Sequence, residues 1–180
     1  MKKIFSLLVI IGIGIGVWYF WPQITNPDTL DSLKSKELVD LRDQGLTEVP
    51  DYVWDQIETK RLLLTGNQLT SLPAELGQLT NLEELRADEN ILTSIPAEIG
   101  KLQNLTILDI SYNRITDIPA EIGQLKNLRE LYLNNNAFST YPNELGNLTE
   151  LKELDIRHTG LSPTKEIEIK GLLPSTTVDL

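Results

Sequence analysis

A 23-residue motif that recurs with its leucines at fixed places constrains this chain more than any other feature of its sequence. Three consecutive copies read LEELRADENILTSIPAEIGKLQN from Leu82, LTILDISYNRITDIPAEIGQLKN from Leu105 and LRELYLNNNAFSTYPNELGNLTE from Leu128. A similar copy begins at Thr59, a less regular one at Lys36 and a divergent last one at Leu151. One copy alone buries little apolar surface, so the sequence predicts a stack of copies that share a continuous core.

The first six residues of each copy, L-x-x-L-x-L, predict a short strand. Successive side chains of a strand point to opposite faces, so the fourth and sixth positions of each copy should point inward. Strands of neighbouring copies would stack about 4.8 Å apart in a parallel sheet. The fourth positions hold Val39, Leu62, Leu85, Leu108, Leu131 and Leu154, and the sixth hold Leu41, Leu64, Ala87, Ile110, Leu133 and Ile156.

An asparagine recurs at the ninth position of four copies, directly after the predicted strand. A side-chain amide carries both donors and an acceptor, so an inward asparagine can satisfy backbone groups in the turns of neighbouring copies. The sequence therefore predicts a structural asparagine ladder made of Asn67, Asn90, Asn113 and Asn136.

The combined pattern L-x-x-L-x-L-x-x-N-x-L-x-x-[IL]-P-x-E-[IL]-G-x-L resembles the leucine-rich repeat family. Its P-x-E-I-G-x-L half is similar to the 23-residue repeats of bacterial leucine-rich repeat proteins and of intracellular signalling ones. The resemblance covers about six repeats in residues 36–173. It implies an α/β solenoid, a horseshoe whose parallel sheet lines the concave face, and it implies an adaptor, receptor or adhesin rather than an enzyme.

The end of the chain, residues 162–180, departs from the repeat and overlaps its last, divergent copy. Ser162 followed by Pro163 predicts a helix start, with the serine as N-cap and the proline in the first turn. Three apolar residues of this helix, Ile169, Leu172 and Leu173, should face the core. After Pro174, the alternation of Val178 and Leu180 predicts a last strand, and the segment as a whole is expected to cap the array.

Residues 1–22 predict a transmembrane signal-anchor. The run Ile4–Trp21 is uncharged and apolar, and as a helix it would span roughly 27 Å, close to the hydrocarbon thickness of a bilayer. Lys2 and Lys3 precede it, which predicts a cytoplasmic N-terminus and an extracytoplasmic repeat domain, periplasmic or extracellular. Residues 23–35 are expected to form a linker and an N-terminal cap.

Two alternatives to an anchored recognition module stay open at this point. Cleavage of the N-terminal segment would give a secreted binding protein. An architectural subunit would instead dock through its anchor helix, where Gly12 and Gly16 have the spacing that permits close helix contact.

Composition excludes several kinds of site. The chain has no cysteine, one histidine and a net charge of -10, which disfavours thiolate metal sites, multi-histidine sites and nucleic-acid binding. Asp88 and Asp109 should lie on neighbouring strands, where two carboxylates could hold Ca²⁺ or act as an acid–base pair. Carboxylates are common on such faces and Arg86 lies among them, so we expect no cofactor, no metal and no enzymatic activity.

The concave face, made of the third, fifth, seventh and eighth positions of each copy, is the predicted binding surface. It carries nine carboxylates against four arginines. Tyrosine and arginine are frequent anchors of protein interfaces, and the acidic excess would favour a basic protein partner. The candidate binding residues are Arg86, Asp88, Glu89, Asp109, Tyr112, Tyr132, Asn134, Asn135, Asp155 and His158.

Overall fold

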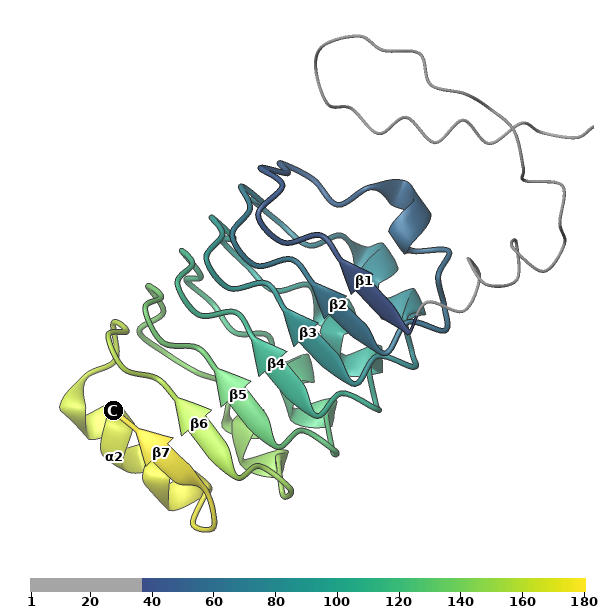
Figure 1. The fold of residues 1–180 in the computed structure, drawn as a ribbon. Helices are drawn as coiled ribbons and strands as arrows, with labels where there is room; N and C mark the ends of the chain where they lie inside the picture. The colour runs from purple at the N-terminus through teal and green to yellow at the C-terminus, as the bar shows by residue number, and fades with distance from the viewer. Residues whose placement is uncertain (1–36) are drawn as a thin grey trace, which may run out of the picture.

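In the computed structural model, which describes residues 37–180, each repeat adds one short strand to a single parallel sheet (Figure 1). The sheet has seven strands in the order of the sequence. Neighbouring repeats are in register, so that Leu62 pairs with Leu85 and Leu85 with Leu108. The strands are β1 (Leu38–Asp40), β2 (Arg61–Leu63), β3 (Glu84–Arg86), β4 (Ile107–Asp109), β5 (Glu130–Tyr132), β6 (Glu153–Asp155) and β7 (Thr177–Asp179).

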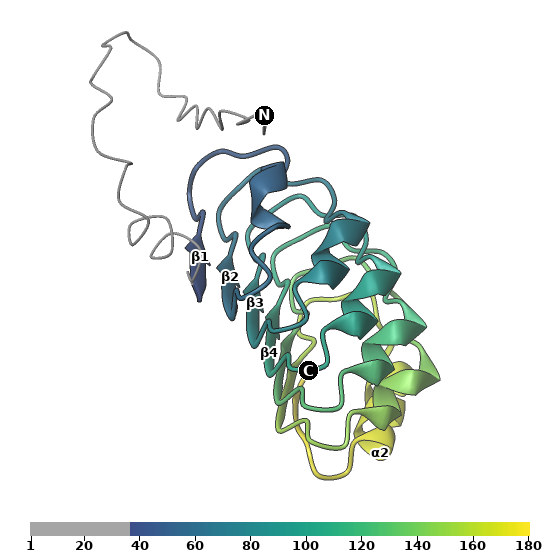
Figure 2. The same cartoon turned by 90° about the vertical axis from the view of Figure 1, so that its right-hand side faces the viewer.

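Short 3₁₀ helices form the opposite side of the molecule, as Figure 2 shows. In each regular repeat a proline directly precedes the helix, and its ring fixes the backbone angle at which the chain turns away from the sheet. The helices are η1 (Asp51–Val53), η2 (Ala74–Gln78), η3 (Ala97–Lys101), η4 (Ala120–Gln124) and η5 (Asn143–Asn147).

The core lies between the sheet and these helices. All residues at the fourth and sixth positions of the repeats are buried, from Val39 and Leu41 in the first copy to Leu154 and Ile156 in the last. Burial of a leucine-sized side chain contributes roughly 1.5–3 kcal/mol to stability. The inward rows that the leucine spacing predicts are confirmed.

The C-terminal end is closed by α2 (Pro163–Leu172) and β7. The Ser162 side chain accepts a hydrogen bond from the Lys165 backbone N–H, which confirms the predicted N-cap. Ile169 and Leu173 are buried as predicted. Leu180 is a correction: it follows the last residue of β7 and is 40% exposed, because the strand ends before the alternation reaches it.

The predicted anchor and linker, residues 1–35, lie outside the described residues. Within residues 37–180, no helix has both the length and the apolar character needed to cross a bilayer.

Candidate functional site

The ladder asparagines join the turn of one repeat to its neighbours. The Asn67 amide nitrogen donates to the carbonyls of Leu41 and Leu64, both at 2.8 Å, and its oxygen accepts from the Leu46 N–H at 3.0 Å. Asn90, Asn113 and Asn136 repeat this arrangement one copy further along each time. Each ladder asparagine uses its amide donors and its acceptor in hydrogen bonds within the protein. The role of the ladder is therefore structural.

A second asparagine ladder, which the sequence analysis missed, stands before the strands. The side-chain amides of Asn81, Asn104 and Asn127 donate to the carbonyls of Ile57, Thr80 and Gln103 at 3.0, 2.9 and 2.8 Å. The signal was present, because an asparagine ends each of these copies. The same argument that predicts the first ladder would have found it.

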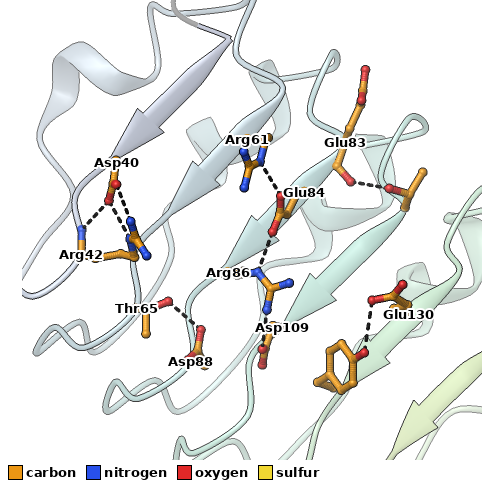
Figure 3. A network of polar contacts seen from close by, with 12 residues as sticks. Asp40, Arg42, Arg61, Thr65, Glu83, Glu84, Arg86, Asp88, Asp109 and Glu130 are labelled. Atoms are coloured by element: carbon orange, nitrogen blue, oxygen red, sulfur yellow. Dashed lines mark hydrogen bonds and ion pairs between the residues drawn. The ribbon is translucent and has the colours of Figure 1, made fainter.

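Successive ion pairs form one connected ion-pair chain across the N-terminal half of the concave face, as Figure 3 shows. Arg61 Nε lies 2.6 Å from Glu84 Oε2, and Arg86 Nε lies 2.6 Å from Glu84 Oε1. Arg86 Nη1 continues the chain to Asp109 Oδ2 at 3.3 Å. Burial raises the pKa of Glu84, but hydrogen bonds from Arg86 and Arg61 outweigh it and lower that pKa overall. The charges of Arg61, Glu84, Arg86 and Asp109 therefore neutralise one another within the protein.

Two bidentate pairs stand at the ends of the face. Arg42 contacts Asp40 through Nε at 2.9 Å and Nη2 at 2.7 Å, and these hydrogen bonds lower the pKa of Asp40 to about 2. Arg157 holds Asp155 in the same way, at 2.9 and 2.6 Å. All four arginines of the concave face therefore have carboxylate partners, and its excess charge is negative.

Three predicted binding residues are largely covered. Asp109 accepts from the Ser111 hydroxyl at 2.7 Å and from its backbone N–H at 3.1 Å, and burial raises the pKa of this carboxyl. Asp155 is 4% exposed and is held by Arg157, and Asn134 is also buried. Alternation along a strand gives the direction of a side chain, but not how closely its neighbours cover it.

The other predicted residues present more surface. Glu89, Tyr112 and His158 are exposed, whereas Arg86, Asp88, Tyr132 and Asn135 are half-buried. The structure joins Arg86 to Asp109 through the ion-pair chain, and Asp88 accepts a hydrogen bond from Thr65 at 2.7 Å.

The eighth position of every repeat has a left-handed backbone, which the sequence analysis also missed. The signal was a set of residues that tolerate this conformation, Asp43, Gly66 and Asn135. Tyr112 departs from this set, because a bulky aromatic residue at a φ of 51° is strained while its side chain is 56% exposed. The core gains nothing from this ring, so the fold does not account for it.

Tyr132 lies between two carboxylates on neighbouring strands. Its hydroxyl donates to Glu130 Oε2 at 3.1 Å, and Glu130 pairs in register with Glu153. Burial and these carboxylates raise the pKa of Tyr132. Among residues 37–180, no lysine or arginine forms an ion pair with either glutamate.

Metal-ligating side chains do not gather in the described part of the chain. Residues 37–180 contain no group of three or more histidine, aspartate or glutamate side chains placed to hold an ion. The concave face instead offers tyrosines among carboxylates, a surface suited to contact with another molecule.

Comparison with known proteins agrees with this geometry. A family model described as a leucine-rich repeat region matches residues 87–172, and another described as a leucine rich repeat matches residues 57–115. A leucine-rich repeat protein of Leptospira interrogans has a similar solved structure, with a TM-score of 0.74 and 40% sequence identity over 75% of this chain and 34% of that one.

An internalin of Listeria monocytogenes is also similar, with a TM-score of 0.63 and 23% identity over 73% of this chain and 37% of the internalin. At this identity the likeness concerns the fold alone. The chain spans about a third of the length of these two proteins. Because two leucine-rich repeat models together match residues 57–172, where β2 to β6 and both asparagine ladders lie, the chain belongs to the leucine-rich repeat family.

Proposed function

We propose that this protein is a recognition module that binds a protein partner on its concave face. The observation that carries the proposal is Tyr112, a strained and exposed aromatic residue that the core does not use. Glu89, Asn135 and His158 occupy the same position in other repeats and add polar contacts along the same edge. Tyrosine provides a large contact area at low entropic cost, which suits an interface anchor.

The partner is basic in this proposal. The arginines of the concave face are held by Asp40, Glu84, Asp109 and Asp155, so its carboxylate excess is left to act on other molecules. Such an excess speeds the encounter with a positively charged protein and disfavours acidic ones. We expect no catalytic role for this face.

The module is anchored in a membrane in this proposal, with its N-terminus in the cytoplasm and its repeats in the periplasm or outside the cell. The support comes from the sequence of residues 1–22, an apolar run preceded by two lysines. Extraction of membranes at alkaline pH should leave the chain in the pellet, and protease added to the extracytoplasmic side should degrade the repeats. Release into the soluble fraction as a shortened chain would favour the secreted alternative.

Crosslinking in native membranes tests the binding face. The full chain, tagged at its C-terminus, is compared with a Tyr112→Ala, Tyr132→Ala double variant and with Tyr52→Ala as a matched control. Tyr52 lies on η1, on the opposite side of the molecule, and is 50% exposed, close to the exposure of Tyr112. We expect one protein to crosslink to the native chain and to Tyr52→Ala but not to the double variant.

Two other outcomes contradict the proposal. Retention of the same protein by all three chains would place binding outside the concave face. Capture that depends only on residues 1–22, tested by replacing them with an unrelated anchor, would favour the architectural alternative.

A further inference from the structure

We propose that the C-terminal half of the concave face binds an arginine side chain of the partner, between Glu130 on β5 and Glu153 on β6, beside the ring of Tyr132. This inference rests on the proposed function and names the chemistry of the contact. We call Glu130, Glu153 and Tyr132, with Ile107, which pairs with Glu130, the arginine-binding surface.

The other half of the same face shows what a glutamate in this row binds. Glu84 occupies the third position of its repeat, as Glu130 and Glu153 do. Its two carboxylate oxygens each accept from a guanidinium at 2.6 Å, one on the preceding strand and one on its own. The fold therefore accommodates guanidinium groups directly above this row of side chains.

The corresponding arginine positions hold different residues around Glu130 and Glu153. Ile107 pairs with Glu130 in the place where Arg61 pairs with Glu84, and Tyr132 stands where Arg86 stands. Glu130 itself precedes Glu153 in the row. Within this row, the chain neutralises Glu84 with its own arginines, whereas among residues 37–180 no lysine or arginine pairs with Glu130 or Glu153.

Juxtaposed carboxylates explain why a cation would bind here. Directly paired residues of adjacent strands have Cβ atoms about 4.5–5.5 Å apart, and like charges at that distance destabilise a sheet. Tyr132 donates one hydrogen bond to Glu130, but it carries no compensating charge. A cation from the partner would relieve this repulsion on binding.

An arginine fits this surface better than a lysine. The guanidinium is planar and can donate to two carboxylates at once, as Arg86 does with Glu84 and Asp109. The Tyr132 ring beside the glutamates gives the guanidinium an aromatic face on which to stack. Ile107, which is half-buried and pairs with Glu130, provides apolar contact for the methylene groups of the same side chain.

Nuclear magnetic resonance of the full chain in zwitterionic micelles tests the inference. The ¹⁵N-labelled chain is titrated with the peptide acetyl-Gly-Arg-Gly-amide, with its lysine analogue and with its citrulline analogue, which keeps the shape of arginine but not the charge. We expect the arginine peptide to shift the amide signals of Tyr132, Glu153 and Ile107 most. The lysine peptide should bind more weakly, and the citrulline peptide should leave these signals unchanged.

Matched variants separate the site from a general effect of charge. The double variant Glu130→Gln, Glu153→Gln should weaken binding of the arginine peptide about fivefold. This factor corresponds to the upper end of the range measured for one partly exposed ion pair. Glu98→Gln with Glu121→Gln makes the same change of charge at two half-buried glutamates of successive repeats on η3 and η4. This control should bind the peptide as tightly as the native chain.

Three results would overturn the inference: equal binding of the citrulline peptide, equal loss of binding in the control, or shifts centred on the Arg61–Asp109 ion-pair chain. The crosslinking experiment distinguishes this failure from failure of the proposed function. A partner retained by the Glu130→Gln, Glu153→Gln chain but lost from the tyrosine double variant would refute the arginine contact alone.

Discussion

At the scale of single residues, Asp109 and Asp155 show how one neighbour decides the behaviour of a buried carboxylate. Both occupy the fifth position of a repeat. Burial raises the pKa of Asp109, and the hydrogen bonds from Ser111 do not compensate for it. Burial also acts on Asp155, but the hydrogen bonds from Arg157 outweigh it, so the pKa of Asp155 is lowered.

These opposite shifts predict opposite pH dependences for two isosteric variants. Asp155 stabilises the fold above its unfolded pKa, near 3.8, and this contribution is lost as the pH falls through the lower folded pKa. Ionised Asp109 costs stability above its raised folded pKa, and that cost disappears as the pH falls below 3.8. Asp155→Asn should therefore lower stability at pH 7, and Asp109→Asn should raise it.

Urea unfolding at pH 7 and at about pH 3 measures both variants. Both differences from the native chain should shrink at the lower pH. Differences of the same sign for the two variants would contradict the opposite pKa shifts of Asp109 and Asp155.

At the scale of elements, the repeat pattern predicts the strands and the ladder well, and it leaves the contacts between polar side chains undetermined. The leucine spacing places Leu85 and Leu108 on paired strands, because a constant period fixes the register. It does not show that Arg86 contacts both Glu84 and Asp109, since that depends on which rotamers the neighbouring strands allow. Tyrosine does not itself predict the left-handed backbone at Tyr112, so this backbone follows only from Asp43, Gly66 and Asn135 at the same position of other repeats.

The asparagine ladder makes a testable contrast with the face beside it. Asn113→Leu removes hydrogen bonds to the carbonyls of Ala87 and Ile110 and from the N–H of Leu92. Backbone groups left without partners in the interior cost about 1–3 kcal/mol each, so the variant should be strongly destabilised. Tyr132→Ala loses only a half-buried ring and one hydrogen bond. In thermal unfolding, the midpoint temperature should fall much further for Asn113→Leu than for Tyr132→Ala. Equal falls in this temperature would contradict the assignment of the two faces.

At the scale of the whole molecule, each repeat contacts only its neighbours, so stability depends on how the ends are closed. At the C-terminal end, α2 packs against η5, and its Ile169 is fully buried. The sequence predicts this cap because the Ser162–Pro163 pair and the break in the repeat mark the same place. It does not predict which molecule the proposed binding face would recognise, because recognition depends on surface contacts that no periodic pattern encodes.

Two isoleucines on α2 test the importance of that end. Ile169→Ala should cost about 2–5 kcal/mol, the usual range for truncating a buried side chain of this size. Ile167→Ala, on the same helix at 70% exposure, should change stability by no more than about 0.5 kcal/mol. Urea unfolding measures both losses. If Ile169→Ala leaves unchanged the slope of unfolding free energy against urea concentration, the array unfolds as one unit. An equal loss of stability in both variants would contradict the packing of α2.

The constant register of the strands also makes this scaffold extensible. Each ladder asparagine donates one hydrogen bond to a carbonyl 26 positions earlier and accepts one from an N–H 21 positions earlier, whichever repeat supplies the asparagine. Insertion of one more complete 23-residue unit after Asn127 would give every junction the partners it already has. Gene duplication or protein engineering can therefore lengthen the molecule by one strand spacing, about 4.8 Å, for each added unit, without changing any existing contact between repeats.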